Sequence, residues 1–136
     1  MDKDEAILCK VVLIGETGVG KTQIVSKFVE GRFTSSLNPT IGAHYYKKTN
    51  YFKDFHKSIR FDIWDTAGQE KYRAIARVFY KDAFICILVY DITRRDTFEQ
   101  LKSYWINAIK TNGLPNISIT IFYKNIFFHS TGNSSK

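Results

Sequence analysis

The residues best suited to chemistry lie first in the run Gly15-Glu-Thr-Gly-Val-Gly-Lys-Thr22. This run follows the apolar stretch Val11 to Ile14, so it predicts a loop between a strand and a helix. Glycines allow backbone N–H groups to curl round phosphate oxygens, and the N-terminus of the following helix adds partial positive charge. Lys21 would then reach the β and γ phosphate oxygens, and the Thr22 hydroxyl would bind Mg²⁺. The alternative interpretation is a flexible turn without a ligand.

A second polar run, Asp65-Thr-Ala-Gly-Gln-Glu70, could complete such a site. Asp65 ends a predicted strand, where a carboxylate can hold the metal through water. The Gly68 N–H can bond a γ-phosphate, and the Gln69 amide can orient an attacking water. A polar turn is the alternative for this run alone. Together the two runs predict phosphoryl transfer from a nucleotide.

The elements that position these runs alternate between strands and helices. Ile59, Phe61 and Ile63 recur at the two-residue period of a strand, and Thr93-x-x-Asp96 resembles a helix-entry box. The expected order is strand 11–14, helix 21–30, loop 32–42, antiparallel strands 45–52 and 58–64, helix 72–80, strand 83–90, a helix ending at Asn112-Gly113, and strand 117–122. This order predicts an α/β fold: a mostly parallel sheet with one antiparallel edge hairpin and helices on both faces.

Composition fits one globular domain of 136 residues, with 44% hydrophobic and 24% charged residues. The net charge of +7 comes from basic residues that are scattered rather than gathered in one run, so we expect no nucleic-acid ligand. Cys9 and Cys86 match no metal or redox spacing. No apolar signal core and no membrane-length apolar stretch of ~20 residues is present, so we expect a cytoplasmic protein with reduced thiols.

Several stretches together resemble one protein family. They are Gly15–Thr22, Thr40-Ile-Gly42, Trp64-Asp-Thr-Ala-Gly-Gln-Glu70, Phe79-Tyr80 and Tyr90-Asp-Ile-Thr93. On these stretches, residues 1–122 resemble the nucleotide-binding G domain of a small GTPase of the Ras superfamily, and within it a Rab. Thr40 to Ala43 and Ile63 to Thr66 are similar to the endosomal branch. The resemblance implies a P-loop NTPase fold.

The resemblance also implies ligands and site residues. The ligands are GTP or GDP with Mg²⁺. The implied nucleotide contacts are Thr17, Gly18, Val19, Gly20, Lys21, Thr22, Gln23, Phe33, Thr40 and Gly68, the implied metal residues are Thr22, Thr40 and Asp65, and the implied catalytic residue is Gln69. Phe33 would pack on the guanine edge. Loss of the γ-phosphate would release Thr40 and Gly68, and this release is the switch.

Partners follow from the same resemblance. Exchange factors, GTPase-activating proteins and effectors of vesicle traffic would read an aromatic patch of Tyr45, Trp64 and Phe79, in a monomeric protein. Packing in the core or at the sheet edge is the alternative for these rings. Thr17 stands where it crowds the γ-phosphate, so intrinsic hydrolysis should be slow.

The chain departs from the family after Phe122. Rabs continue into Asn-Lys-x-Asp, whose aspartate binds guanine, whereas Tyr123-Lys-Asn-Ile-Phe follows here and no acidic residue comes after Glu99. We therefore expect weak nucleotide binding with little base selection, and a non-family, disordered tail over 123–136.

The last strand and helix and the prenylated cysteines are not found, which predicts no lipid anchor in this chain. Only a prenylated form would reach the cytoplasmic face of endomembranes. The competing function is a weakly nucleotide-binding fragment that acts only as an interaction module.

Overall fold

A five-stranded sheet organises the computed structural model, which describes residues 5–33, 42–68 and 73–124. The strands are β1 (Ile7–Ile14), β2 (Ala43–Phe52), β3 (Lys57–Thr66), β4 (Ile85–Asp91) and β5 (Ser118–Lys124), in the spatial order β2-β3-β1-β4-β5. The helices are α1 (Lys21–Glu30), α2 (Arg73–Tyr80), α3 (Arg95–Gln100) and α4 (Ile106–Asn112), with a short 3-10 turn η1 (Lys53–Phe55) and a π-helical segment η3 (Leu101–Trp105) between α3 and α4.

Strand pairing confirms the predicted sheet. β1 pairs in parallel with β3 and β4, and β4 pairs in parallel with β5. Only β2, at one edge, runs antiparallel, and its register with β3 extends from Ala43 opposite Thr66 to Phe52 opposite Lys57. Because the parallel strands all point the same way, the loops that follow β1, β3 and β4 lie together at the carboxyl ends of these strands.

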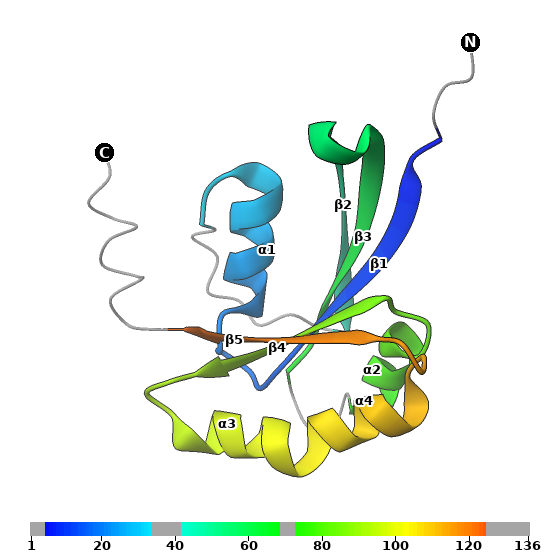
Figure 1. Ribbon diagram of the computed structural model, residues 1–136. Coiled ribbons are helices and arrows are strands. Elements are labelled where there is room, and N and C mark those ends of the chain that lie inside the picture. Colours follow the sequence, from blue (N-terminus) through cyan, green and yellow to red (C-terminus); the bar gives the residue numbers. More distant parts are fainter. Residues whose placement is uncertain (1–4, 34–41, 69–72, 125–136) are drawn as a thin grey trace.

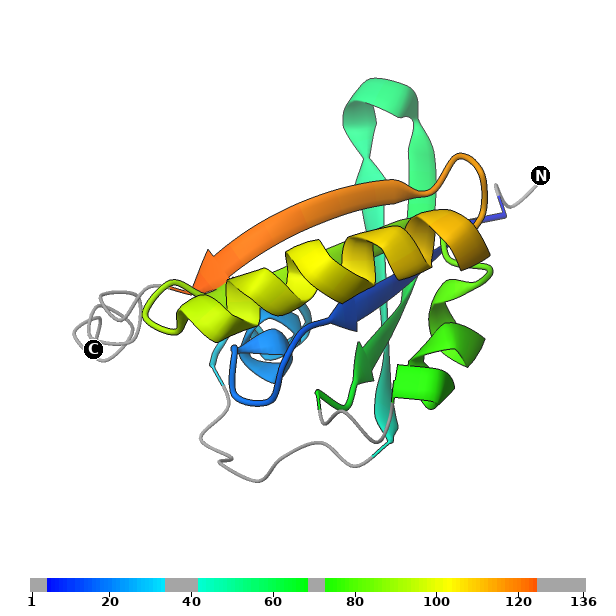
Figure 2. The ribbon, with the colours of Figure 1, turned by 90° about the horizontal axis from the view of Figure 1, so that it is seen from below.

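Helices cover both faces of the sheet, as predicted (Figure 1). On one face, Val12 and Leu88 of the sheet pack against Leu101 and Trp105 of η3 and Ile109 of α4. On the other face, alternate strand residues such as Leu13 and Val89 pack with Val25 of α1. Figure 2 shows α3, η3 and α4 as one continuous helix running along β5. The fold is a mixed α/β fold of the predicted class.

Element ends differ from the predicted bounds where neighbours extend the pairing. β1 begins at Ile7 rather than Val11, because Ile7 to Lys10 pair with Ile59 to Asp62 of β3. β5 continues through Tyr123 and Lys124, which pair with the end of β4. Within the described part of the chain β5 forms the other sheet edge, and Ile121, Phe122 and Tyr123 are about half exposed.

The predicted entry box of the long helix is wrong. α3 begins at Arg95 with Arg94 as N-cap, and no side chain caps its first turn. The buried Thr97 hydroxyl instead donates to the Arg94 carbonyl and accepts from the Asp91 N–H. Thr93 donates to the Asp91 carboxylate. Thr93 therefore stabilises the turn that precedes the helix, since its hydroxyl donates to the Asp91 carboxylate.

No helix within the described ranges is long and apolar enough to cross a membrane.

Candidate phosphate-binding site

The loop from Gly15 to Gly20 joins β1 to α1 and requires glycine for separate reasons. Gly18 and Gly20 have φ of +79° and +101°, in the left-handed region that side chains rarely adopt. Gly15 lies against β4, since a Cβ there would be 2.2 Å from the Val89 carbonyl oxygen. The glycines of the motif are thus needed by the backbone path itself.

The N-terminus of α1 lies at the end of this loop and has little to neutralise it. Gly20, its N-cap, has no side chain, and no acidic residue occurs in the first turn. The partial positive charge of the helix N-terminus is therefore available to an anion at the loop.

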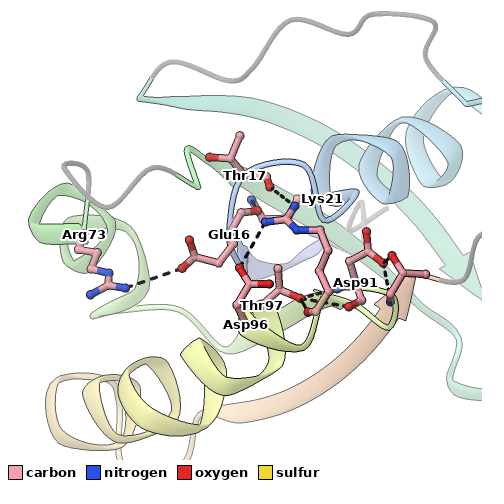
Figure 3. Close-up of polar contacts among 9 residues, drawn as sticks. Glu16, Thr17, Lys21, Arg73, Asp91, Asp96 and Thr97 are labelled. Carbon is pink, nitrogen blue, oxygen red and sulfur yellow. Dashed lines mark hydrogen bonds and ion pairs between the residues drawn. The ribbon is translucent and has the colours of Figure 1, made fainter.

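Lys21 bends back across the loop (Figure 3). Its ammonium donates to the carbonyls of Gly15 at 2.7 Å and Glu16 at 2.9 Å, and the residue is only 6% exposed. Burial lowers the pKa of Lys21 to about 8, against the opposing effect of the Asp65 and Glu16 carboxylates. A buried cation of this kind favours an anionic ligand, which would compensate its desolvation.

Thr22 and Asp65 form a pair of oxygen donors beside Lys21. The Thr22 hydroxyl donates to the Asp65 carboxylate at 2.5 Å, although the two residues are far apart in sequence. The parallel pairing of β1 with β3 causes this, because it sets Leu13 beside Asp65 at the end of both strands. Hydroxyl and carboxylate oxygens are the ligands that Mg²⁺ takes in proteins, so this donor set fits the implied metal.

The second loop contacts the first through Gly68. A Cβ at Gly68 would lie 2.4 Å from the Thr17 nitrogen and 2.5 Å from the Glu16 carbonyl carbon, so the two backbones touch there. The neighbouring Ala67 N–H donates to the Gly42 carbonyl at 2.7 Å. The segment after β3 therefore contacts both the glycine-rich loop, through Gly68, and Gly42, through Ala67.

The other residues predicted for the site are only partly brought together. Thr17 and Gly18 are exposed on the loop, Val19 is buried beneath it, and Gln23 is half-buried in α1. Phe33 follows α1, and its ring lies 5.4 Å from the Lys27 ammonium. Thr40 and Gln69 lie outside the described residues.

The predicted aromatic patch forms one row of rings across β2, β3 and α2. The Tyr45 and Trp64 ring centroids are 4.9 Å apart, and those of Trp64 and Phe79 are 5.0 Å apart. The Tyr45 hydroxyl donates to Asp62 at 2.5 Å, and this hydrogen bond raises the pKa of Tyr45. Tyr45 is 47% exposed, whereas Trp64 and Phe79 are half-buried, so the row is partly open to solvent.

Two arginines at the site were not expected from the sequence. Arg94, from the turn after β4, donates to the Thr17 carbonyl at 3.1 Å. Arg73, at the start of α2, lies 3.8 Å from the Glu16 carboxylate (Figure 3). The position of Arg94 just after a parallel strand was a usable signal, since it predicts the same sheet edge. No sequence pattern pairs Arg73 with Glu16.

Comparison with known proteins decides the family. Residues 10–125 match the Ras family. The chain belongs to the Ras family. Ras-related protein Rab-22A of Homo sapiens is 49% identical to this Ras-family chain over 113 residues, which are 82% of the chain and 56% of that relative. Ras-related protein Rab-31 of Rattus norvegicus is 43% identical over 113 residues, again 82% of the chain and 56% of the relative.

A plant relative extends the match slightly. Ras-related protein RABA1b of Arabidopsis thaliana is 41% identical over 121 residues, which are 89% of the chain and 55% of the relative. The chain thus spans about half the length of the curated relatives it matches. The matches confirm the predicted Rab-type assignment and its endosomal branch, and with them the P-loop GTPase fold. They give no support to the alternative of a fragment that is only an interaction module.

Proposed function

We propose that this chain binds GTP and GDP with Mg²⁺ and hydrolyses GTP, as a switch in vesicle and membrane traffic. The observation that carries the proposal is the meeting of the two loops: Gly68 touches Thr17 while Asp65, from the same strand end, accepts a hydrogen bond from Thr22. A triphosphate at the glycine-rich loop would contact both loops at once.

We propose the following roles from the motif and the resemblance, and the positions of the described residues support them. The Lys21 ammonium, already turned into the loop, neutralises the β and γ phosphates. Thr22 and Asp65 hold Mg²⁺, which supplies positive charge to the phosphate oxygens on which negative charge develops during transfer. The Gly68 N–H binds the γ-phosphate. Thr40 as a metal residue and Gln69 as the residue that orients water remain proposals from the resemblance.

The proposed switch uses the contact at Gly68. A γ-phosphate bound by the Gly68 N–H holds the second loop in one position, and loss of that phosphate removes the bond. The row of Tyr45, Trp64 and Phe79 adjoins this loop through β3 and α2, which makes it the proposed surface for effectors, exchange factors and GTPase-activating proteins.

Base selection is proposed to be weak. The residues that follow β5 supply no carboxylate for the guanine N1 and N2 groups, since none occurs after Glu99. Each charged hydrogen bond lost costs about 1.5–3 kcal/mol of binding free energy. We therefore expect phosphate and Mg²⁺ contacts to dominate the affinity of this chain, and GTP to exceed ATP in affinity by less than about tenfold.

Titration of the purified chain with fluorescently labelled GTP and ATP tests the proposal. Lys21→Ala should weaken GTP binding by about 10- to 100-fold, because one charged contact to the phosphates is lost. Lys110→Ala is the control, since Lys110 is an exposed lysine of α4, away from the glycine-rich loop. Saturable binding lost only in Lys21→Ala supports the proposal. No binding by the parent chain, or equal binding by both variants, contradicts it.

A further inference from the structure

Arg73 is the first residue of α2, and its guanidinium contacts two separate segments of the chain. It lies 3.8 Å from the Glu16 carboxylate of the glycine-rich loop and donates to the Gln100 side-chain oxygen at 2.5 Å. It also lies over the Tyr104 ring, 4.4 Å from its centroid, and 5.9 Å from the centroid of Trp105. Figure 3 shows the Glu16 side chain pointing toward Arg73.

The chemistry of these contacts is specific to arginine. A guanidinium is planar, so one face can stack on an aromatic ring while its N–H groups donate in their own plane to a carboxylate and an amide. A lysine ammonium could keep the charge but not the stacking and the fork together. The side chains of Arg73 and Glu16 are each only 21% exposed, so solvent screens their attraction less than it does a surface pair.

The local helix geometry contributes to this arrangement. Tyr104 and Trp105 lie in η3, the π-helical segment, and their rings pack edge to face with centroids 4.9 Å apart. Trp105 is 3% exposed and belongs to the core cluster under the sheet. Arg73 therefore packs on the pair of rings Tyr104 and Trp105, called here the η3 platform, and Trp105 is buried in the core.

These contacts connect the phosphate loop to the aromatic row. At one end of the connection, Glu16 lies beside Thr17, the residue that Gly68 touches. At the other end, α2 carries Phe79, which stacks on Trp64. Arg73, the first residue of α2, therefore links the start of this helix to the loop at Glu16.

We propose that Arg73 is a positioning residue that ties the start of α2 to the phosphate loop and to the η3 platform, so that a nucleoside triphosphate at the loop sets the position of α2. This inference rests on the proposed function, because it assumes that the loop binds the triphosphate. The contacts of Arg73 given above, with Glu16, Gln100, Tyr104 and Trp105, involve no proposed metal or catalytic residue. Its loss should therefore affect the response to the nucleotide more than the affinity for it.

The fluorescence of Trp105 gives a direct readout. The chain has two tryptophans, so Trp64→Phe leaves Trp105 as the single emitter. In this background the parent should change its emission between the states with Mg²⁺-GDP and with a non-hydrolysable Mg²⁺-GTP analogue, because Arg73 lies close to the indole. Arg73→Ala should abolish the change while the dissociation constants stay within about threefold.

Matched variants sharpen the test. Arg77→Ala removes an exposed arginine one turn further along α2 and should keep the fluorescence change. Arg73→Lys should lose most of it, since charge alone does not restore the stacked contact. Glu16→Gln, which keeps the size of the side chain, should lower GTP hydrolysis by about tenfold. The double variant should be no worse than Arg73→Ala alone, because that substitution already removes the contact with Glu16.

The outcomes separate the two claims. If the parent binds nucleotide and Arg73→Ala matches Arg77→Ala in fluorescence change and hydrolysis, the role of Arg73 is wrong and the proposed function stands. If the parent binds no nucleotide, the proposed function fails and this inference fails with it. Should Arg73→Ala not fold, as judged by circular dichroism, Glu16→Gln decides: an unchanged fluorescence response there overturns the role of the contact.

Discussion

Lys21 shows how burial prepares a single side chain for a ligand. Its ammonium is desolvated, bound by two backbone carbonyls, and has a pKa lowered to about 8. A bound phosphate would stabilise the charged form, so its binding must raise that pKa again. Lys21 therefore links nucleotide affinity to pH.

The sign of this link gives a prediction. Well below pH 8 Lys21 is protonated in the free chain and contributes no pH dependence. Above pH 8 it is mostly neutral, so the nucleotide binds together with a proton. The association constant for GTP should therefore fall by up to about tenfold per pH unit between pH 8 and pH 9.5. Titrations across this range check it, with Lys21→Met as the control that lacks this ionisation. An equal pH dependence in both chains would exclude Lys21 as the cause.

The Thr97 hydroxyl differs from the Lys21 ammonium, because its hydrogen bonds serve the fold and no ligand is needed to compensate its burial. It is fully buried and bonds both the Arg94 carbonyl and the Asp91 N–H. Thr97→Val keeps the shape but leaves these groups without their partner, so we expect a loss of about 1–3 kcal/mol in the free energy of unfolding. Thr111→Val, at an exposed threonine of α4, should cost less than about 1 kcal/mol. Urea denaturation measures both, and equal losses would refute the assignment.

Between elements, the contact of the two loops leaves the least space for a side chain at Gly68. Gly68 approaches backbone atoms of Glu16 and Thr17, which cannot move aside as a flexible side chain would. The glycine of the second loop is thus required by contact with another loop, since its own φ is not in the left-handed region.

Gly68→Ala should therefore separate the loops. We expect GTP hydrolysis to fall by at least about tenfold and GDP binding to change by less than about threefold, because only the γ-phosphate needs the second loop in place. Gly31→Ala is the control: a Cβ there meets no atom within 4 Å, and its φ of +76° costs only stability, about 1 kcal/mol. Single-turnover assays check both variants, and hydrolysis at the parent rate in Gly68→Ala would contradict the role of the contact.

Local sequence was a good guide to elements whose causes are local. Helix α1 begins at Lys21, after the apolar run of β1 and the glycine-rich loop, and ends at Glu30, before the stop signal at Gly31. Both ends were predicted. The helix entry at Thr93 could not be read correctly, since Asp91 competes for that hydroxyl only once the strand places it there. The π-helical turn at Tyr104 likewise has no local sequence signal.

At the scale of the whole molecule, parallel strand order explains most of the candidate site. Because β1, β3 and β4 end at one edge, Lys21 and Asp65 could be expected together from strand order alone. Arg73 could not, because its contacts with Glu16 and Gln100 join α2 to segments that are distant in the sequence and meet only in the packed fold. Motifs predict what the backbone and the ligand require, whereas contacts between distant side chains depend on packing that no short pattern records.

The central claim is that the two loops hold one magnesium triphosphate between them. Its most direct test is calorimetric titration of the chain with a non-hydrolysable GTP analogue, with Mg²⁺ and with EDTA, for the parent and for Asp65→Asn. The account predicts that Mg²⁺ tightens binding to the parent by at least about tenfold and that Asp65→Asn removes this gain, since the carboxylate paired with Thr22 is the proposed metal residue. Binding of the same strength with and without Mg²⁺ in the parent would contradict it.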